Sequence, residues 1–162
     1  MERAVTDLLF EEISEADVPE LTAVMTRAFD DDAQKHLGQE RGGPPGYDDG
    51  EFFRTWVFGY EESIGYKIIA DGKIIGGLIV WFLKNGDKGL GTVFLEPAYQ
   101  DQGIGTRTWQ FVERTYPETR NWWLETPSWA TKNHYFYEEK CGFRRVDVRE
   151  DSFIYRKEMV ES

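Results

Sequence analysis

A glycine-containing turn in the middle of the chain is the segment best suited to chemistry. An apolar run ends at Glu96-Pro97, a short polar turn follows, and Gly103-Ile104-Gly105 opens a stretch with helical spacing. The first backbone N–H groups of a helix have no partner within the helix and lie at its positive end, so they attract anions. Glycine lets an anion approach the backbone closely, because no side chain is in the way. The segment therefore predicts a site for a pyrophosphate.

The dinucleotide-binding turn of an oxidoreductase is one alternative for this segment. Its Gly-x-Gly-x-x-Gly pattern would place the third glycine at Thr108. The turn also does not follow the first strand of a βαβ unit, where such a turn belongs. The sequence therefore disfavours nicotinamide chemistry.

A second group of polar and aromatic residues lies about thirty residues further on. Together the two segments carry, in order, Gln100, Gly103, Gly105, Asn133, Tyr137, Lys140, Gly142 and Phe143. This order resembles the GNAT superfamily of N-acetyltransferases. The family's phosphate-gripping motif is Gln/Arg-x-x-Gly-x-Gly/Ala, and its later motif is an Asn and then a Tyr before Lys-x-Gly-Phe. The resemblance covers nearly the whole chain, and the pair of motifs is more specific than either one alone.

The resemblance implies that acetyl-CoA lies where two neighbouring parallel strands splay apart, here Gly91–Glu96 and Trp122–Thr126. The backbone of the first strand would bind the pantetheine arm, with Leu95 facing the thioester, and the glycine turn would hold the pyrophosphate. The residues expected to bind this co-substrate are Phe94, Leu95, Gln100, Asp101, Gln102, Gly103, Ile104, Gly105, Thr106, Asn133 and Tyr137. No metal is expected.

Tyr137 is the candidate general acid. Asn133 and Tyr137 are four residues apart, so both project from one helix face. If that face lines the cofactor cleft, the phenol can protonate the departing thiolate of CoA while Asn133 orients the arm. The alternative is that Tyr137 packs in the core beside Phe136 with its hydroxyl bonded elsewhere. The family pattern favours the acid.

Direct transfer to an amine also needs a group that takes a proton. Glu96 and Glu125 are the candidate bases, because each lies at the end of one of the two splayed strands, although such glutamates are commonly just solvated. His134 is a weaker third candidate, since it lies one position off the Asn133–Tyr137 face and is expected at the surface. Cys141 is predicted to be a buried structural thiol rather than a nucleophile.

The elements that position these residues follow from hydrophobic spacing and turn signals. Strands are predicted over 8–13, 65–70, 73–83, 91–96, 122–126, 144–149 and 153–158, and helices over about 15–29, 50–58, 103–116 and 131–140. Asp71-Gly72 predicts a two-residue hairpin turn, and residues 39–50 are too rich in Gly and Pro for regular structure. The expected fold is α+β. It is a GNAT-like mixed, mostly antiparallel twisted sheet of about seven strands, with helices on both faces and a splayed central strand pair.

Composition limits the class of protein. The 162 residues suit a single domain, 1–162. A net charge of −11 disfavours nucleic-acid binding through a basic face. No apolar stretch approaches the roughly 20 residues that span a bilayer, and no signal peptide is evident. One cysteine cannot form an internal disulfide. We therefore expect a cytoplasmic protein with neither a nucleic-acid nor a membrane partner.

The expected activity is transfer of an acetyl group from acetyl-CoA to a primary amine. A small cationic amine is favoured over a protein N-terminus or a lysine, because an acidic and aromatic rim attracts cations. That rim is Asp30, Asp31, Asp32, Tyr47, Asp48, Asp49 and Trp56. An acidic protein can also simply have acidic loops. The alternative function is a non-catalytic acyl-CoA-binding or sensing module, which would not need the phenol of Tyr137. A homodimer is left open by the resemblance.

Overall fold

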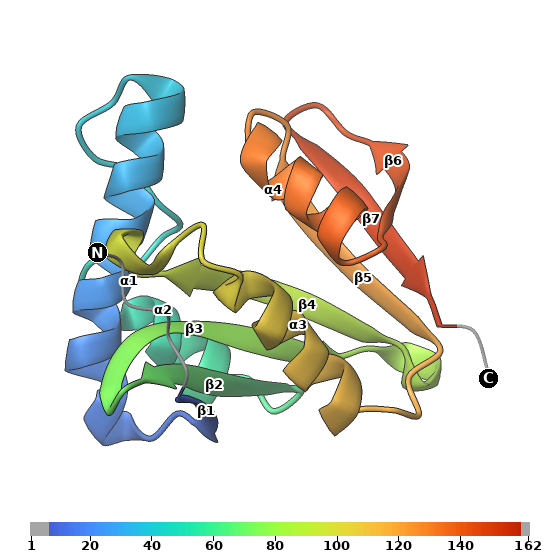
Figure 1. The fold of residues 1–162 in the computed structure, drawn as a ribbon, viewed down its shortest axis with the longest axis horizontal. Coiled ribbons are helices and arrows are strands. Elements are labelled where there is room, and N and C mark those ends of the chain that lie inside the picture. The colour runs from blue at the N-terminus through green and yellow to red at the C-terminus, as the bar shows by residue number, and fades with distance from the viewer. Residues whose placement is uncertain (1–6, 160–162) are drawn as a thin grey trace. The chain divides into compact units, whose positions relative to one another are not determined.

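The computed structural model describes residues 7–159 of the chain (Figure 1). Within them, seven strands form one sheet in the order β1-β2-β3-β4-β5-β7-β6. The strands are β1 (Leu8–Glu12), β2 (Ser63–Ala70), β3 (Lys73–Phe82), β4 (Lys88–Leu95), β5 (Asn121–Pro127), β6 (Arg144–Val148) and β7 (Ser152–Glu158). The helices are α1 (Val18–Asp32), α2 (Glu51–Phe53), α3 (Ile104–Thr115) and α4 (Thr131–Tyr135). The predicted α+β class and mixed sheet are confirmed.

The chain divides into two compact units. The first holds the described residues up to Ile79 together with Thr92–Ile104, and the second holds Val80–Gly91 together with the described residues from Gly105 onward. Strands β3 and β4 each contribute residues to both units. The single domain over 1–162 stays a prediction.

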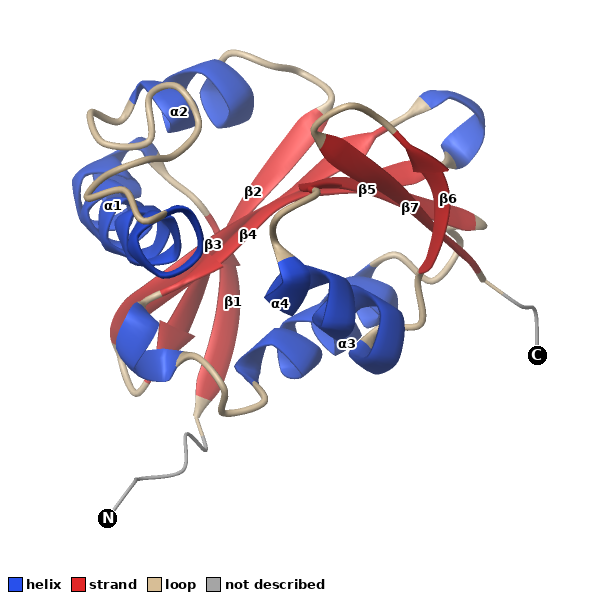
Figure 2. Ribbon diagram, turned by 90° about the horizontal axis from the view of Figure 1, so that it is seen from above, coloured by secondary structure: helices blue, strands red, loops and turns tan. Residues whose placement is uncertain are grey.

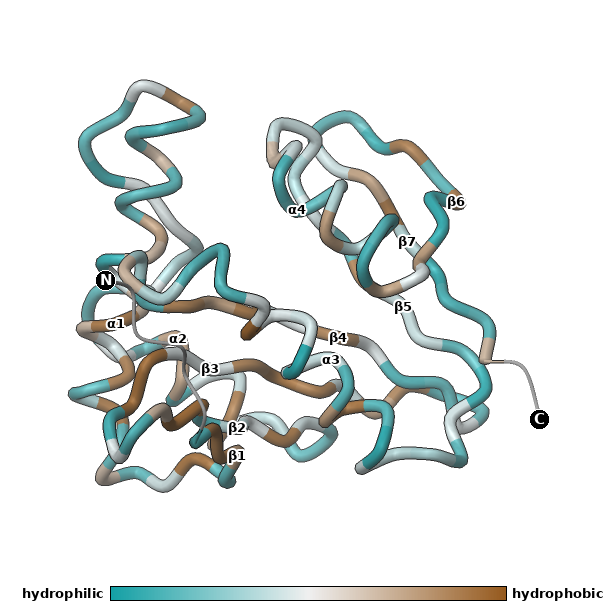
Figure 3. Tube along the Cα trace, in the orientation of Figure 1, coloured by the Kyte–Doolittle hydropathy of each residue, from teal (hydrophilic) through white to brown (hydrophobic). Residues whose placement is uncertain are grey.

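In the first unit, β1 pairs antiparallel with β2, with Leu8 opposite Ala70. The predicted hairpin turn between β2 and β3 is confirmed, since Asp71 and Gly72 both have positive φ, 50° and 83°, as a type I′ turn requires. Hydrophobic residues run along β3 (Figure 3). The fully buried core of this unit includes Leu21, Val24, Met25, Phe53, Ile68, Ile75, Leu78 and Ile79.

Two helices differ from the sequence prediction. The first was expected to end at Phe29, but α1 continues through Asp32 and into a π-helical turn, Ala33–Leu37. Burial of Ala33 outweighs the weak helix propensity of three consecutive aspartates, and Gly38, with φ of 63°, ends the helix. The acidic run Asp30–Asp32 therefore forms the last residues of α1. The predicted helix over 50–58 is the short α2 followed by a π-helical turn, Arg54–Phe58.

In the second unit, the start of β4 pairs parallel with β5, with Lys88 opposite Trp122, and β7 pairs antiparallel with both β5 and β6. Figure 2 shows α3 and α4 on one side of β5 and β7. Aromatic rings fill the space between, where Trp109 lies 5.3 Å from Trp122 and 5.0 Å from Phe143 between ring centroids. Thr115, the last residue of α3, is exposed. No helix in residues 7–159 is long and apolar enough to cross a membrane.

Candidate active site

The end of β4 is tied down by hydrogen bonds within the first unit. The backbone N–H of Glu96 donates to the carbonyl of Ile75 at 2.6 Å, and Pro97 then opens a single 3₁₀ turn. The side-chain amide of Gln100 donates to the carbonyl of Leu95 at 3.2 Å. This bond folds the polar turn back onto the strand end. The expected contact of Gln100 with a pyrophosphate stays a prediction.

The two glycines of the Gly-x-Gly motif serve different purposes. Gly103 has φ of 79°, in the left-handed region, and a side chain added there would begin in open space, with no atom within 4 Å of its Cβ. At Gly105, in the second unit, the constraint is steric instead, because a Cβ added there would lie only 3.0 Å from the ring of Phe136. Gly103 therefore leaves the backbone before α3 accessible, whereas Gly105 allows α3 to pack against the helix that carries Tyr137.

Glu96, one of the two predicted bases, forms an ion pair that no sequence pattern indicated. Both of its carboxylate oxygens accept hydrogen bonds from Arg27 on α1, at 2.6 and 2.7 Å. The Glu96 side chain is only 12% exposed, against 52% for Arg27. Hydrogen bonds to Glu96 raise the pKa of the guanidinium above its ordinary value. The glutamate is therefore held in one orientation rather than merely solvated.

Tyr137 lies in the second unit, in a π-helical turn (Phe136–Lys140) that continues α4. Its ring packs against Phe136 and Phe143, at 5.2 and 5.8 Å between centroids, and burial raises the pKa of its phenol well above the ordinary value. Within residues 7–159 no hydrogen bond to the Tyr137 hydroxyl is recorded. The neighbouring phenol of Tyr155 differs, because it donates to Glu138 at 2.7 Å.

Asn133 does not share the burial of Tyr137. It is exposed, and its side-chain amide donates to the hydroxyl of Thr126, at the end of β5, at 3.4 Å. The helix changes from α to π geometry between the two residues, which alters the angle between their side chains. The contact of Asn133 with a cofactor arm stays a prediction.

The remaining candidate bases occupy different surroundings. Glu125 on β5 is exposed and accepts a hydrogen bond from the hydroxyl of Ser152 at 2.5 Å. His134 is half-buried, with a ring nitrogen 2.9 Å from the carbonyl oxygen of Pro127, and its ring lies 4.8 Å from that of Phe153. The imidazole is thus engaged by the end of β5 and by β7.

Cys141 is buried, and this burial raises the pKa of its thiol to about 12. Such a thiol carries almost no thiolate at neutral pH, which agrees with the predicted structural role. In the described part of the chain, no group of three or more His, Cys, Asp or Glu side chains is placed to hold a metal ion.

The acidic rim is partly neutralised by its own basic residues. Asp30 accepts hydrogen bonds from the hydroxyl of Tyr47 at 2.6 Å, from the N–H of Gly42 at 3.1 Å and from Arg41 at 3.4 Å. Burial alone would raise the pKa of Asp30, but these hydrogen bonds outweigh it and lower the pKa. Arg41 also pairs with Asp48 at 2.9 Å. Segment 30–54 nevertheless contains seven Asp and Glu against three Lys and Arg, a net charge of −4.

Solved acetyltransferases have the same architecture. One from Thermus thermophilus superposes with a TM-score of 0.81 at 15% identity, covering 97% of this chain and 100% of that chain. The PaiA N-acetyltransferase of Thermoplasma acidophilum, solved in complex with coenzyme A, gives a TM-score of 0.73 at 16% identity, covering 95% and 100%. At such identities the likeness establishes the fold alone: this chain shares the fold of these two solved proteins.

Two sequence comparisons then identify the family. The model of the acetyltransferase (GNAT) family matches residues 21–143. An uncharacterized protein of Bacillus subtilis (strain 168), YrkN, is 31% identical over 142 residues, which are 86% of this chain and 75% of YrkN. The chain therefore belongs to the GNAT family of acetyltransferases, and the family predicted from the paired motifs is confirmed.

Proposed function

We propose that this acetyltransferase moves the acetyl group of acetyl-CoA directly to the primary amine of a small cationic acceptor. The observation that carries the proposal is the turn before α3. Its left-handed Gly103 leaves open space beside backbone N–H groups at the positive end of a helix of 12 residues. A pyrophosphate fits such a place, and a side chain at position 103 would begin in that same space.

The co-substrate supplies an activated acetyl group as a thioester, and the residues of the chain bind and orient it. The backbone of Phe94 and Leu95 would hold the pantetheine arm, residues 100–106 would hold the pyrophosphate, and Asn133 would also contact the arm. The parallel pairing of β4 with β5 lies at Lys88 and Gly89, at the start of both strands, and the splay further along stays a prediction. The PaiA relative, solved with coenzyme A, supports the choice of ligand.

Tyr137 would hold the proton that the departing sulfur needs. Its raised pKa keeps the phenol protonated at neutral pH, so it can act only as an acid. Burial that raises the pKa of a phenol also raises that of a nearby thiol, because both anions are disfavoured away from water.

Glu96 is the better supported of the two bases. Arg27 and the backbone bond to Ile75 fix its position, which is the preorganisation that proton transfer requires. A carboxylate has about four lone-pair directions, and Arg27 uses one on each oxygen, so Glu96 can still accept a proton. Glu125, which is exposed, is the second candidate.

A cation is the favoured acceptor because the net charge of −4 on segment 30–54 remains after the internal ion pairs are counted. Trp56 adds a ring that is 40% exposed, within this same unit. A protein N-terminus or a lysine side chain is the alternative. The cytoplasmic location and the homodimer stay predictions.

Two measurements test this proposal. Calorimetry should show acetyl-CoA binding that weakens about tenfold in Gln102→Glu, because a carboxylate is placed in the pyrophosphate turn. Gln110→Glu makes the same change on the exposed face of α3 and should bind normally. Release of free thiol from acetyl-CoA should then be stimulated more by diamines and polyamines than by peptides.

The outcomes separate the two functions. If Gln102→Glu and Gln110→Glu both bind acetyl-CoA like the wild type, the pyrophosphate site is wrongly placed. If the wild type binds acetyl-CoA but acetylates nothing across diverse amines, the chain is an acyl-CoA-binding or sensing module instead.

A further inference from the structure

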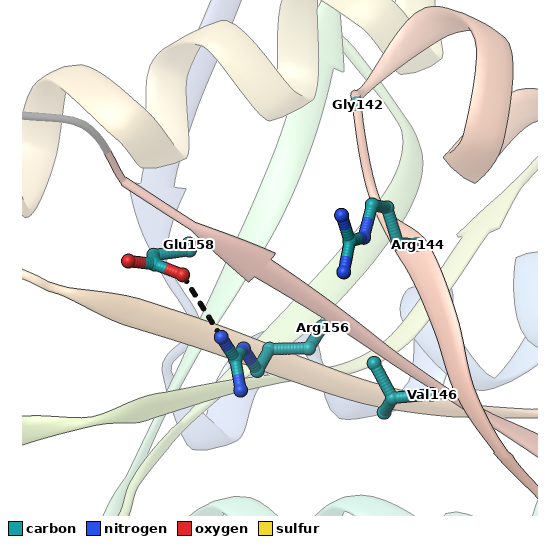
Figure 4. Close-up of a pocket in the computed structure, with 5 residues that line it drawn as sticks. All are labelled: Gly142, Arg144, Val146, Arg156 and Glu158. Carbon is teal, nitrogen blue, oxygen red and sulfur yellow. Dashed lines mark hydrogen bonds and ion pairs between the residues drawn. The ribbon is translucent and has the colours of Figure 1, made fainter.

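A pocket lies on β6 and β7 of the second unit, built from residues that the proposed reaction does not use (Figure 4). Its volume is about 180 Å³, and its lining residues are Gly142, Arg144, Val146, Arg156 and Glu158. Strand β6 is the last strand of the sheet, so the pocket opens at a sheet edge. Gly142 has φ of 80°, and a Cβ added there would make ordinary contact with the side chain of Lys157, at 3.5 Å.

Two arginines face one another in this pocket. Arg144 on β6 is directly opposite Arg156 on β7 in the strand register, which places their Cβ atoms about 4.5–5.5 Å apart on the same face. Like charges placed directly opposite destabilise a sheet. The arrangement is notable in a chain of net charge −11, where acidic residues are plentiful.

The acidic group inside the pocket balances only one of these charges. Glu158 accepts a hydrogen bond from Arg156 at 2.9 Å, as Figure 4 shows. For Arg144, which is exposed, no ion pair is recorded within residues 7–159. The lining of the pocket therefore carries a net positive charge next to an open volume.

Arg156 is also held in place from its other side. Its guanidinium lies 5.7 Å from the ring centroid of Trp123 on β5, and Trp123 is itself fixed by a hydrogen bond from its indole N–H to Asp87 at 3.1 Å. A guanidinium held by a ring and a carboxylate loses little freedom when it binds a further group. Of the two arginines that line the pocket, Arg156 is therefore already ordered.

We infer that this pocket binds an oxyanion, a phosphate or carboxylate group, between the guanidiniums of Arg144 and Arg156. A planar or tetrahedral oxyanion can accept charge-assisted hydrogen bonds from both, which removes the repulsion between them. Val146 would contact the apolar part of a ligand that carries the anion. Glu158 competes with the ligand for Arg156, which limits the affinity of the pocket for the ligand.

The test uses the full chain and inorganic phosphate as the probe, with acetate as a second probe at matched ionic strength. Arginine Nε–Hε signals in NMR spectra should shift saturably for Arg144 and Arg156. Arg144→Gln should weaken this binding about tenfold, because one of two charge-assisted partners is lost. Glu158→Gln should strengthen it, since the competing carboxylate is gone. Arg149→Gln is the matched control, because Arg149 is an exposed arginine that faces Asp147, outside the pocket.

Backbone amide signals of residues 102–105 report separately on phosphate at the proposed pyrophosphate turn. Tighter binding of phosphate than of acetate at the arginines would identify a phosphoryl ligand, and the reverse order a carboxylate. The inference is overturned if neither anion shifts the Arg144 and Arg156 signals saturably, or if Arg144→Gln and Arg149→Gln weaken binding equally.

Discussion

Replacement of Tyr137 by Phe is the most direct test of the proposed acid, because it removes one hydroxyl and leaves the ring. The ring contacts with Phe136 and Phe143 are made by carbon atoms that Phe retains. The hydroxyl has no recorded hydrogen bond within residues 7–159, so its loss should leave no buried partner unpaired. We therefore expect the free energy of unfolding of Tyr137→Phe to stay within about 1 kcal/mol of wild type.

The catalytic effect should be much larger than the effect on stability. General acids supply typically 10²–10⁴-fold, and a water molecule can replace part of that contribution. We expect kcat to fall about tenfold or more, which corresponds to roughly 1.4 kcal/mol in the activation barrier. The affinity for acetyl-CoA should not change, because the proton is needed only when the sulfur departs.

Thiol release from acetyl-CoA with the best amine of the panel measures kcat, and calorimetry measures the affinity. Tyr155→Phe provides the matched control, because its phenol donates to Glu138 at 2.7 Å. Losing a hydrogen bond to a charged group should cost that variant about 1.5–3 kcal/mol of stability while kcat is unchanged. A wild-type kcat in Tyr137→Phe, or equal losses of kcat in both variants, would refute the role of Tyr137 as the acid.

Two further predictions concern charge. If Arg27 acts through Glu96, Arg27→Gln alone should lower kcat severalfold, but it should have no further effect in a protein that already carries Glu96→Gln. Arg27→Lys, which keeps the positive charge, should retain part of the rate that Arg27→Gln loses. Additive losses of kcat in this double-mutant cycle would contradict the proposed role of Arg27. Burial raises the pKa of Cys141 from 9.0 to about 12, so the folded state holds that proton more tightly than the unfolded state. The resulting stability is complete below pH 9 and is lost as the pH rises towards 12. Denaturant unfolding between pH 7 and 11 should therefore show a shallower alkaline loss in Cys141→Ala than in the wild type.

The local signals of the sequence predicted much of the fold because each has a short-range physical cause. Asp71-Gly72 specifies its turn through two positive φ angles, and Pro117 follows α3 closely, as expected of a residue that cannot continue a helix. The paired motifs predicted the family for a related reason, since they combine a backbone requirement at Gly103 with side chains at fixed helical spacing. The hydrophobic spacing that distinguishes strands from helices predicted the order of the elements and the α+β class.

The contacts that the sequence could not predict join residues far apart in the chain. Arg27 and Glu96 are 69 residues apart, and neither the helix pattern around the first nor the strand end at the second indicates the other. The π-helical turns were missed because hydrophobic spacing does not distinguish them from α-helix over five residues. One consequence is that Asn133 is exposed and Tyr137 is buried, although ideal α-helical spacing places them on one face.

The glycine motif shows why a correct pattern can conceal two physical causes. At Gly103 the requirement is conformational, since φ of 79° disfavours any side chain while the space beyond it is open. At Gly105 the requirement is steric, since a Cβ would press on Phe136, the residue directly before Tyr137. A substitution at Gly103 therefore alters the turn where the phosphates are proposed to bind, whereas one at Gly105 displaces the helix that carries the proposed acid. A single motif thus contains both a residue of the turn proposed to bind the phosphates and a residue that packs against the helix of Tyr137.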